Sequence, residues 1–310
     1  MTTLITTHID CLAHRPGADH PEGPQRLTAV LDALRAPEFA LAQWRDAPLG
    51  SLDQVRRVHS ADYVDWVQAS VPSEGRCTLD GGDTVMSPGS WNAVLRCVGA
   101  ACDGVDAVMA GEVSNVFCAT RPCGHHAEAT RAMGFCIFNQ AAIAALHARA
   151  QHGLKRVAVI DFDVHHGNGT QNSFYRDPDL FYGSSHQAPF YPGTGALGET
   201  GVAHNIVNIP LPSGAGSDVF RARMSAEMFP ALRAFGPELL IISAGFDAHH
   251  LDPLGGLQLT DDDYHWVTVE LMRVAAESAQ GRVVSVLEGG YSLKGLASGT
   301  AAHVRALMGR

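Results

Sequence analysis

The stretch Val157-Ala-Val-Ile160, followed by Asp161-Phe-Asp163-Val-His165-His166-Gly-Asn168-Gly169, decides the fold. Four aliphatic residues in a row predict a strand buried on both faces, as the strands of a parallel sheet are. Six other short apolar runs have the same character: Leu4–Thr7, Val116–Thr120, Leu180–Ser184, Ile206–Ile209, Leu239–Ser243 and Val283–Leu287. The sequence therefore predicts a mainly parallel sheet.

Longer segments rich in alanine and leucine predict helices between and after these strands. They are Gln25–Leu34, Ser90–Ala110, Ala141–Ala150, Asp218–Leu232, Asp261–Ala279 and Leu296–Met308. Ser90 is expected to be an N-cap, and Thr260 followed by three aspartates marks another helix start. Strands that alternate with helices predict a three-layer α/β/α fold. Because no linker or repeat interrupts residues 1–310, we expect a single domain.

Composition excludes several classes of protein. Of 310 residues, 46% are hydrophobic and 17% are charged, which suits a large core and not a disordered chain. A net charge of −10 argues against nucleic acid or an anionic membrane as a partner. No membrane span or signal peptide is recognisable, so a cytoplasmic location is expected. The oligomeric state stays open, with a homo-oligomer among the options.

Cysteine and histidine usage points to different roles. The seven cysteines are scattered without a Cys-x-x-Cys pair, which predicts core thiols in a reducing cytoplasm, not disulfides or a thiolate zinc site. The 16 histidines include three adjacent pairs: His125-His126, His165-His166 and His249-His250. Adjacent histidines favour metal or proton chemistry.

Ionisable clusters follow four of the predicted strands. They are Arg121-Pro-Cys-Gly-His125-His126, the segment from Asp161 to Asn168, Ala244-Gly-Phe-Asp247 and Glu288-Gly-Gly-Tyr291. Since ligands bind beyond the carboxyl ends of parallel strands, we expect one site there.

A metal ion is the first element of this expected site. Alternate residues of a strand share one face, but Asp161 and His165 would lie about 13 Å apart in an extended segment. We therefore expect Asp163 and His165 to flank the ion, with Asp161 deeper and Asp247 as a third ligand. Two carboxylates and one imidazole leave room for a water molecule, as in catalytic zinc sites. The alternative is that Asp163 and His165 only cap the loop.

The pair His125-His126 can handle the protons that hydrolysis requires, because an activated water needs a base and a leaving amine needs an acid. Each imidazole needs a partner on its other nitrogen, and Asp161 and Asn168 are available. One partner is charged and the other neutral, so the pKa values of the two histidines should differ. Tyr291 offers a phenol for a developing oxyanion, although a lone tyrosine there could simply cover the sheet.

Together these motifs resemble the zinc-dependent histone deacetylases and their bacterial relatives, particularly class II. The matching strings occur in family order from His20-Pro-Glu-Gly-Pro-Gln-Arg26-Leu27 through Gly124-His-His126, Gly134-Phe135, Asp161 to Gly169, Gly245-Phe-Asp247 and Gly289-Gly-Tyr291. They cover most of the chain. Asn168, where class I members carry aspartate, supports class II. The resemblance implies the arginase/deacetylase fold, a single parallel sheet covered by helices on both faces.

The resemblance also implies a role for each matching residue. One zinc ion would be bound by Asp163, His165 and Asp247. His126 matches the general base and acid, His125 its electrostatic companion, and Tyr291 the residue that polarises the acetyl carbonyl. Supporting and substrate-binding roles are implied for Asp161 and Asn168 behind the histidines, Gly134, Phe135 and Tyr191 along the acyl-lysine tunnel, Asp83 at its rim and Arg26 at an internal acetate channel. A potassium ion beneath the zinc would be bound by Asp161, Ser184 and main-chain oxygens of Asp163, His165 and Ser185.

The implied activity is the hydrolytic removal of acetyl or other short acyl groups from lysine-like amines. Tyr291 is a tyrosine and not the histidine that weakens some class II members, so we expect an active enzyme. His249 stands where a two-manganese arginase would need another aspartate, which favours one metal. An acetylpolyamine amidohydrolase is one alternative. A non-catalytic acyl-lysine binding module is another, which would need neither His126 nor Tyr291.

Position 254 bears on the choice of substrate. Family members specialised for polyamines place a glutamate two residues after the aspartate of an Asp-Pro step, but here Asp252-Pro253 is followed by Leu254. Leu254 therefore favours an acylated lysine or similar neutral acylamine over a cationic polyamine. Two considerations oppose this: Leu254 could face the core, and Glu22 or Asp83 could still attract cations.

Overall fold

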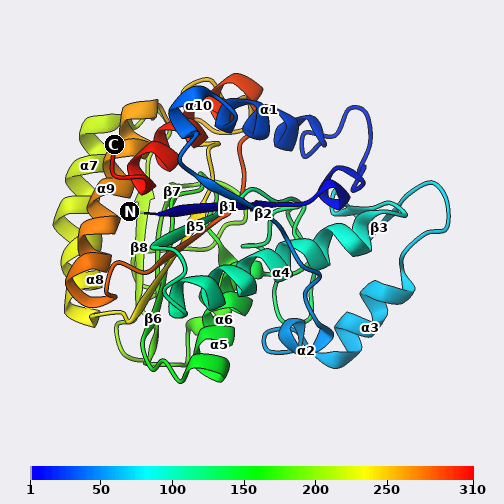
Figure 1. The fold of residues 1–310 in the computed structure, drawn as a ribbon, viewed down its shortest axis with the longest axis horizontal. Helices are drawn as coiled ribbons and strands as arrows, with labels where there is room; N and C mark the ends of the chain where they lie inside the picture. Colours follow the sequence, from blue (N-terminus) through cyan, green and yellow to red (C-terminus); the bar gives the residue numbers. More distant parts are fainter. Residues whose placement is uncertain (1) are drawn as a thin grey trace.

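Eight parallel strands hydrogen-bond into one sheet in residues 2–310, the part of the chain described by the computed structural model (Figure 1). Their order is β2-β1-β5-β10-β9-β6-β7-β8, and every neighbouring pair is parallel. The strands are β1 (Thr3–Thr7), β2 (Gln43–Asp46), β5 (Asn115–Cys118), β6 (Val157–Asp161), β7 (Leu180–Gln187), β8 (Ile206–Leu211), β9 (Leu239–Ala244) and β10 (Val283–Leu287). The predicted mainly parallel sheet is confirmed.

Helices cover both faces of this sheet (Figure 1). One face packs against α1 (Gln25–Leu34), α7 (Ser217–Arg223), α8 (Phe229–Phe235), α9 (Asp261–Ser278) and α10 (Leu293–Leu307), and the other against α4 (Ser90–Met109) and α5 (Gln140–His152). In β6, Ala158 and Ile160 face the first layer, whereas Val157 and Val159 face the second. This alternation explains why the strand is apolar at every position and confirms the three-layer fold.

The remaining elements are short. They are α2 (Leu52–Val55), α3 (Ala61–Ala69), α6 (Asn168–Phe174), the 3-10 helices η1 (Ile9–Leu12) and η2 (Pro37–Phe39), and the antiparallel pair of β3 (Cys77–Thr78) and β4 (Val85–Met86). None of these was predicted, and neither was β2, whose residues Gln43–Asp46 are mostly exposed at the sheet edge and show no apolar run. Within residues 2–310, no helix combines the length and hydrophobicity needed to cross a bilayer.

Several predicted boundaries are wrong. α10 begins at Leu293 and not at the predicted Leu296, and β7 continues to Gln187 beyond the predicted end at Ser184. The strand predicted over Val116–Thr120 ends at Cys118. The helix predicted over Asp218–Leu232 is divided by a π-helical turn, Met224–Met228, just before Pro230, which has no amide hydrogen to donate. Ser90 is the first helical residue, and the N-cap is Gly89. The Ser90 hydroxyl accepts from the amide of Ser87 (2.8 Å), which precedes the helix.

The helix start at Thr260 is confirmed. Thr260 is the N-cap of α9 and forms a capping box with Asp263. The Thr260 amide donates to Asp263 Oδ2 (2.9 Å), so the aspartate satisfies a helix-end group as the sequence indicates.

Candidate active site

The four ionisable clusters meet because their strands are neighbours. β5, β10, β9 and β6 lie side by side in the sheet. Leu287 at the end of β10 pairs with Ala244 at the end of β9, and Asp161 at the end of β6 pairs with Ser243 of β9. The loops that follow therefore leave the sheet at one level, on its carboxyl edge, as expected.

Asp163, His165 and Asp247 form a compact group of possible metal ligands. One donor atom from each lies within 4.8 Å of the others. His165 Nδ1 is 3.1 Å from Asp163 Oδ1 and 3.2 Å from Asp247 Oδ2. Both carboxylates are fully buried, whereas His165 is only partly buried and gives the group an open side.

Backbone amides orient these two carboxylates. The amide of Gly289 donates to Asp163 Oδ2 (2.8 Å), and the amide of Val164 donates to Asp247 Oδ1 (2.8 Å). Glycine is required at position 289, because a Cβ there would lie 2.6 Å from Asp163 Oδ2. The other oxygen of each carboxylate is thereby directed at His165.

The electrostatics of this group fit a cation. Asp247 Oδ2 is buried and accepts no hydrogen bond. Burial, with the nearby charge of Asp163, raises the pKa of Asp247 to about 7. Burial opposes a charge on His165, but the hydrogen bond to Asp163 and the nearby charge of Asp247 raise its pKa to about 10. The loop-capping alternative explains Asp163 Oδ1, which accepts from the His165 amide (2.9 Å), but not Asp247 Oδ2. A divalent ion with nitrogen and oxygen ligands would interact with both of these carboxylate oxygens.

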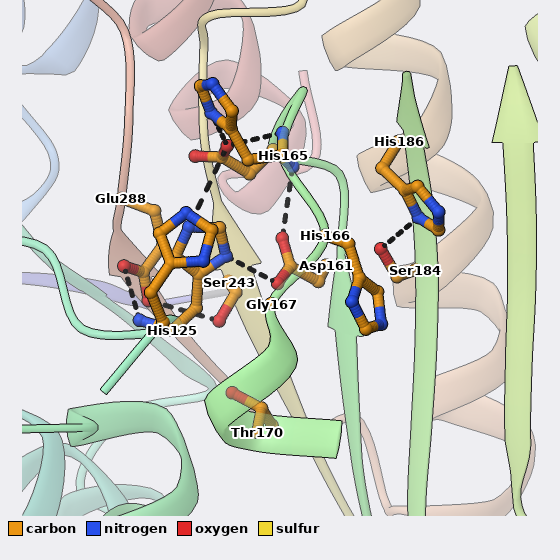
Figure 2. A network of polar contacts seen from close by, with 12 residues as sticks. His125, Asp161, His165, His166, Gly167, Thr170, Ser184, His186, Ser243 and Glu288 are labelled. Carbon is orange, nitrogen blue, oxygen red and sulfur yellow. Dashed lines mark hydrogen bonds and ion pairs between the residues drawn. The ribbon is translucent and has the colours of Figure 1, made fainter. Parts of the chain in front are cut away.

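The two adjacent histidines have different partners. His125 Nδ1 donates to Asp161 Oδ2 (2.9 Å; Figure 2), and His126 Nδ1 donates to Asn168 Oδ1 (2.9 Å). Burial opposes a charge on His125, but Asp161 and Asp163 outweigh it and raise its pKa well above the usual range. Burial and the charge on His125 lower the pKa of His126 well below that range. The expected difference between the two pKa values is therefore present.

Glu128 fixes the tautomer of His126. The Asn168 amide nitrogen donates to Glu128 Oε1 (2.8 Å), so the Asn168 oxygen must face His126. His126 then carries its proton on Nδ1, and its Nε2 is free to accept one. The ring of His126 lies 5.8 Å from the ring of His165, beside the possible metal ligands.

Asp161 lies deeper, as expected. It is the last residue of β6, and its carboxylate accepts from the Tyr182 hydroxyl (3.0 Å) and from the Asp163 amide (3.1 Å). Ser184 is its partner in register on β7. The Ser184 hydroxyl hydrogen-bonds to His186 Nδ1 (2.9 Å; Figure 2). The neighbouring Ser185 is buried.

Tyr291 lies on a loop that is bound from both sides. Arg26 donates to the carbonyls of Gly290 and Glu288 (both 2.6 Å), and its guanidinium lies 5.0 Å from the centroid of the Tyr291 ring. Asp252 Oδ2 accepts from the Tyr291 amide (2.6 Å). Arg26 thus supports the Tyr291 loop directly, a contact that the sequence did not indicate.

Aromatic side chains surround the histidines on the open side. The Tyr191 ring lies 5.2 Å from His126, and Phe135 lies 5.8 Å from Tyr291. Gly134 lets these loops approach, because a Cβ there would lie 3.0 Å from His126 Cγ and 3.1 Å from Tyr191 Cε1. Phe190, which sequence reasoning missed although it adjoins Tyr191, stacks on His165 at 5.1 Å.

Two rim residues are exposed. The side chain of Asp83 is exposed, and its carbonyl accepts from His20 Nε2 (2.9 Å). Leu254 is 38% exposed, so the alternative that it faces the core is wrong. Its amide donates to Asp252 Oδ1 (2.9 Å), and the same aspartate holds Tyr291. The Asp252 side chain therefore connects the backbone at Leu254 to the loop that carries Tyr291.

Glu22 cannot attract a cationic substrate, so the expectation from the sequence that it could do so is wrong. It is fully buried between Arg26 (3.1 Å) and Arg121 (2.5 Å). Burial opposes its charge, but Arg121, His14 and Arg26 hold its pKa well below the usual range. The ion-pair group is structural and joins the loop after β5 to α1.

Glu288 is a buried residue of the site that sequence reasoning noted but gave no role. Its Oε2 accepts from the amides of Gly124 (2.7 Å) and His125 (3.2 Å), and the Ser243 hydroxyl donates to Oε1 (3.2 Å; Figure 2). Burial raises its pKa to about 7. The signal that could have found it is an acidic residue directly after a buried strand.

Comparisons with known proteins show the family to which this chain belongs. Residues 20–307 match the family model described as the histone deacetylase domain. A histone deacetylase-like amidohydrolase of Pseudomonas aeruginosa is 40% identical over 279 residues, which cover 89% of this chain and 72% of the relative. The polyamine deacetylase HDAC10 of Homo sapiens is 37% identical over 327 residues, which cover 100% of this chain and 48% of the relative. The crystal structure of the HDA15 HD domain superposes with a TM-score of 0.92 at 33% identity, covering 99% of this chain and 90% of that one.

Proposed function

This chain belongs to the histone deacetylase family and hydrolyses amide bonds, and we propose that it is a zinc-dependent deacetylase of lysine-like acylamines. The observation that supports this most is that Asp163, His165 and Asp247 converge beside His126, whose Nε2 is free. Zinc held there would act as a Lewis acid and make a water molecule more acidic.

The residues of the chain perform the proton transfers in this proposal. His126 Nε2 accepts the proton of the attacking water and afterwards donates a proton to the leaving amine. His125, held charged by Asp161, stabilises the negative charge that develops nearby. The Tyr291 hydroxyl donates to the oxyanion formed from the acyl carbonyl. Phe135 and Tyr191 would flank the acyl chain and exclude water from it.

The substrate in this proposal is an acylated lysine or a similar neutral acylamine. Exposed Leu254 offers no negative charge beside the tyrosine loop, and Glu22 is neutralised by two arginines. Polyamine deacetylation is the second candidate, because a relative named polyamine deacetylase is 37% identical over 100% of this chain. A non-catalytic binding module would leave the oriented His126 without a purpose.

We also propose three further properties. Residues 1–310 form a single catalytic domain, since the two hydrophobic layers pack on one sheet. Potassium binds at Asp161, Ser184 and the main-chain oxygens of Asp163, His165 and Ser185, and Asp161 and Ser184 are register partners on neighbouring strands. The protein works in a reducing compartment, the cytoplasm, because its seven cysteines are thiols.

A direct assay tests the main proposal. Purified protein should release acetate from an acetyl-lysine peptide, lose this activity on treatment with a chelator and regain it with zinc. A metal-loaded protein that binds a hydroxamate but hydrolyses neither acetyl-lysine nor acetylated polyamines would instead support the binding module.

A further inference from the structure

Two cysteines contact each other next to the histidine pair. Cys136 Sγ lies 3.4 Å from Cys123 Sγ. Cys123 precedes Gly124 and His125, and Cys136 directly follows Phe135. The two thiols are 3% and 0% exposed and share a small apolar cluster with Ala127 and Phe135. The loop that carries the base and the loop that carries the tunnel wall therefore touch through sulfur atoms.

A carboxylate lies within reach of both thiols. One oxygen of Glu288 and the two sulfurs all lie within 4.8 Å of one another. The same carboxylate accepts from the amide of Gly124 (2.7 Å), which anchors it beside Cys123. The Cys123 thiol itself donates to the Gly134 carbonyl (3.9 Å), so Glu288 is a neighbouring carboxylate and not its hydrogen-bond partner.

We propose that Cys123 and Cys136 form a reversible disulfide on reaction with hydrogen peroxide, and that this bond inactivates the enzyme. The disulfide follows from the sulfur contact alone, whereas inactivation rests on the proposed deacetylase function. Transient disulfides of this kind are the form that redox sensing takes in reducing compartments.

The reaction balances with hydrogen peroxide as the oxidant. Cys123, which is 3% exposed against 0% for Cys136, loses its thiol proton and attacks one peroxide oxygen. The O–O bond breaks, and a sulfenic acid and hydroxide form; the hydroxide takes up the proton and leaves as water. The Cys136 thiol then attacks the sulfenic sulfur, the S–O bond breaks and a second water leaves. Two thiols are oxidised to one disulfide, and one peroxide is reduced to two waters.

Closing the bond would disturb the site because the loops have no free space. A disulfide needs its sulfurs about 2.05 Å apart, so the present 3.4 Å must shrink by about 1.4 Å. A Cβ on Gly134 would already lie 3.0 Å from His126 Cγ, and Phe135 holds a φ of 67°. Displacement of catalytic groups by about 1 Å typically costs ~10²-fold in rate.

The test uses the zinc-loaded full chain and two readouts. After limited hydrogen peroxide and blocking of free thiols, peptide mass spectrometry should find Cys123 linked to Cys136. Acetyl-lysine hydrolysis should fall at least tenfold and return with dithiothreitol. Cys123→Ala and Cys136→Ser should retain activity within about threefold when untreated and should resist peroxide. Cys97→Ala is the matched control, since Cys97 Sγ donates to the Pro122 carbonyl (3.5 Å), and it should remain sensitive.

Several outcomes would overturn the proposal. One is that Cys123 and Cys136 remain thiols while other cysteines are oxidised. Another is that both cysteine variants are inactivated as fast as wild type. A second zinc equivalent that both variants lose would show a thiolate metal site instead. If Cys123 and Cys136 are linked and activity is undiminished, the disulfide does not inactivate the enzyme. Because the linkage is measured by mass, an absence of deacetylase activity would refute the proposed function without affecting the disulfide result.

Discussion

The centre of the site and its rim differ in how their side chains are held. At the centre, Asp163 and Asp247 are fully buried and receive backbone amides, and the bond to Asn168 sets the tautomer of His126. At the rim, Tyr191 is 44% exposed and Leu254 is 38% exposed. The centre is preorganised for one chemistry, whereas the rim can change without disturbing it. Substitutions in the centre should therefore affect metal binding or kcat, and substitutions at the rim should affect substrate preference.

Removing a ligand at the centre should have the largest effect. Asp163→Ala or Asp247→Ala leaves two of three ligands, so bound metal should fall from about one equivalent to nearly none, with loss of activity. Metal content is measured by mass spectrometry after dialysis, with exposed Asp262→Ala as the matched control. Two equivalents in wild type would contradict a single-metal centre; His249, which faces Asp261 at 3.2 Å, is not one of the clustered ligands.

The proton-transfer residues should come next. His126→Ala should lower kcat by ~10²–10⁴-fold, as expected on losing a general base. Tyr291→Phe should lower kcat by ~10²–10³-fold, as expected on losing an oxyanion donor. Both variants should keep their metal and bind a hydroxamate, because neither residue is among the clustered ligands. Near-normal kcat in Tyr291→Phe would rule out the oxyanion role.

The neutral partner of His126 sets the pH dependence of the reaction. A general base works unprotonated, so kcat/KM should fall as the pH drops through the pKa of His126, which burial and His125 hold low. Asn168→Asp places a carboxylate beside His126 and should raise that pKa by about 1–3 units. The acidic limb of the pH–rate profile should therefore move to higher pH.

A control is needed because the new carboxylate would face Glu128, which now accepts from the Asn168 amide (2.8 Å). Adding Glu128→Gln relieves this repulsion, and the double variant should show the same direction of shift. An unchanged acidic limb in both variants would mean that another group controls it.

The sequence predicted the residues at the centre of the site better than the residues and elements that hold them in place. The central strands and the residues that follow them were located because buried parallel strands are short apolar runs and their loops carry charged residues. The segment with α2, α3 and β3 was missed, because its elements are short and are stabilised by packing, as Tyr63 and Val67 pack with Phe138. The contacts of Arg121 with Glu22 and of Glu288 with His125 join residues 99 and 163 positions apart, and local patterns carry no information about such pairs.

The smallest expected effect lies at the rim. Wild type should have a higher kcat/KM on an acetyl-lysine peptide than on N8-acetylspermidine, because Leu254 provides no counter-charge for the polyamine ammonium groups. Leu254→Glu should shift the ratio toward the polyamine. Since this position is 38% exposed, an ion pair there contributes about 1 kcal/mol or less, so the shift should be up to about fivefold. Leu254→Gln, of similar shape but neutral, should leave the ratio nearly unchanged. A wild-type preference for acetylspermidine would instead support the polyamine candidate and place the selective group elsewhere, for example at exposed Asp83.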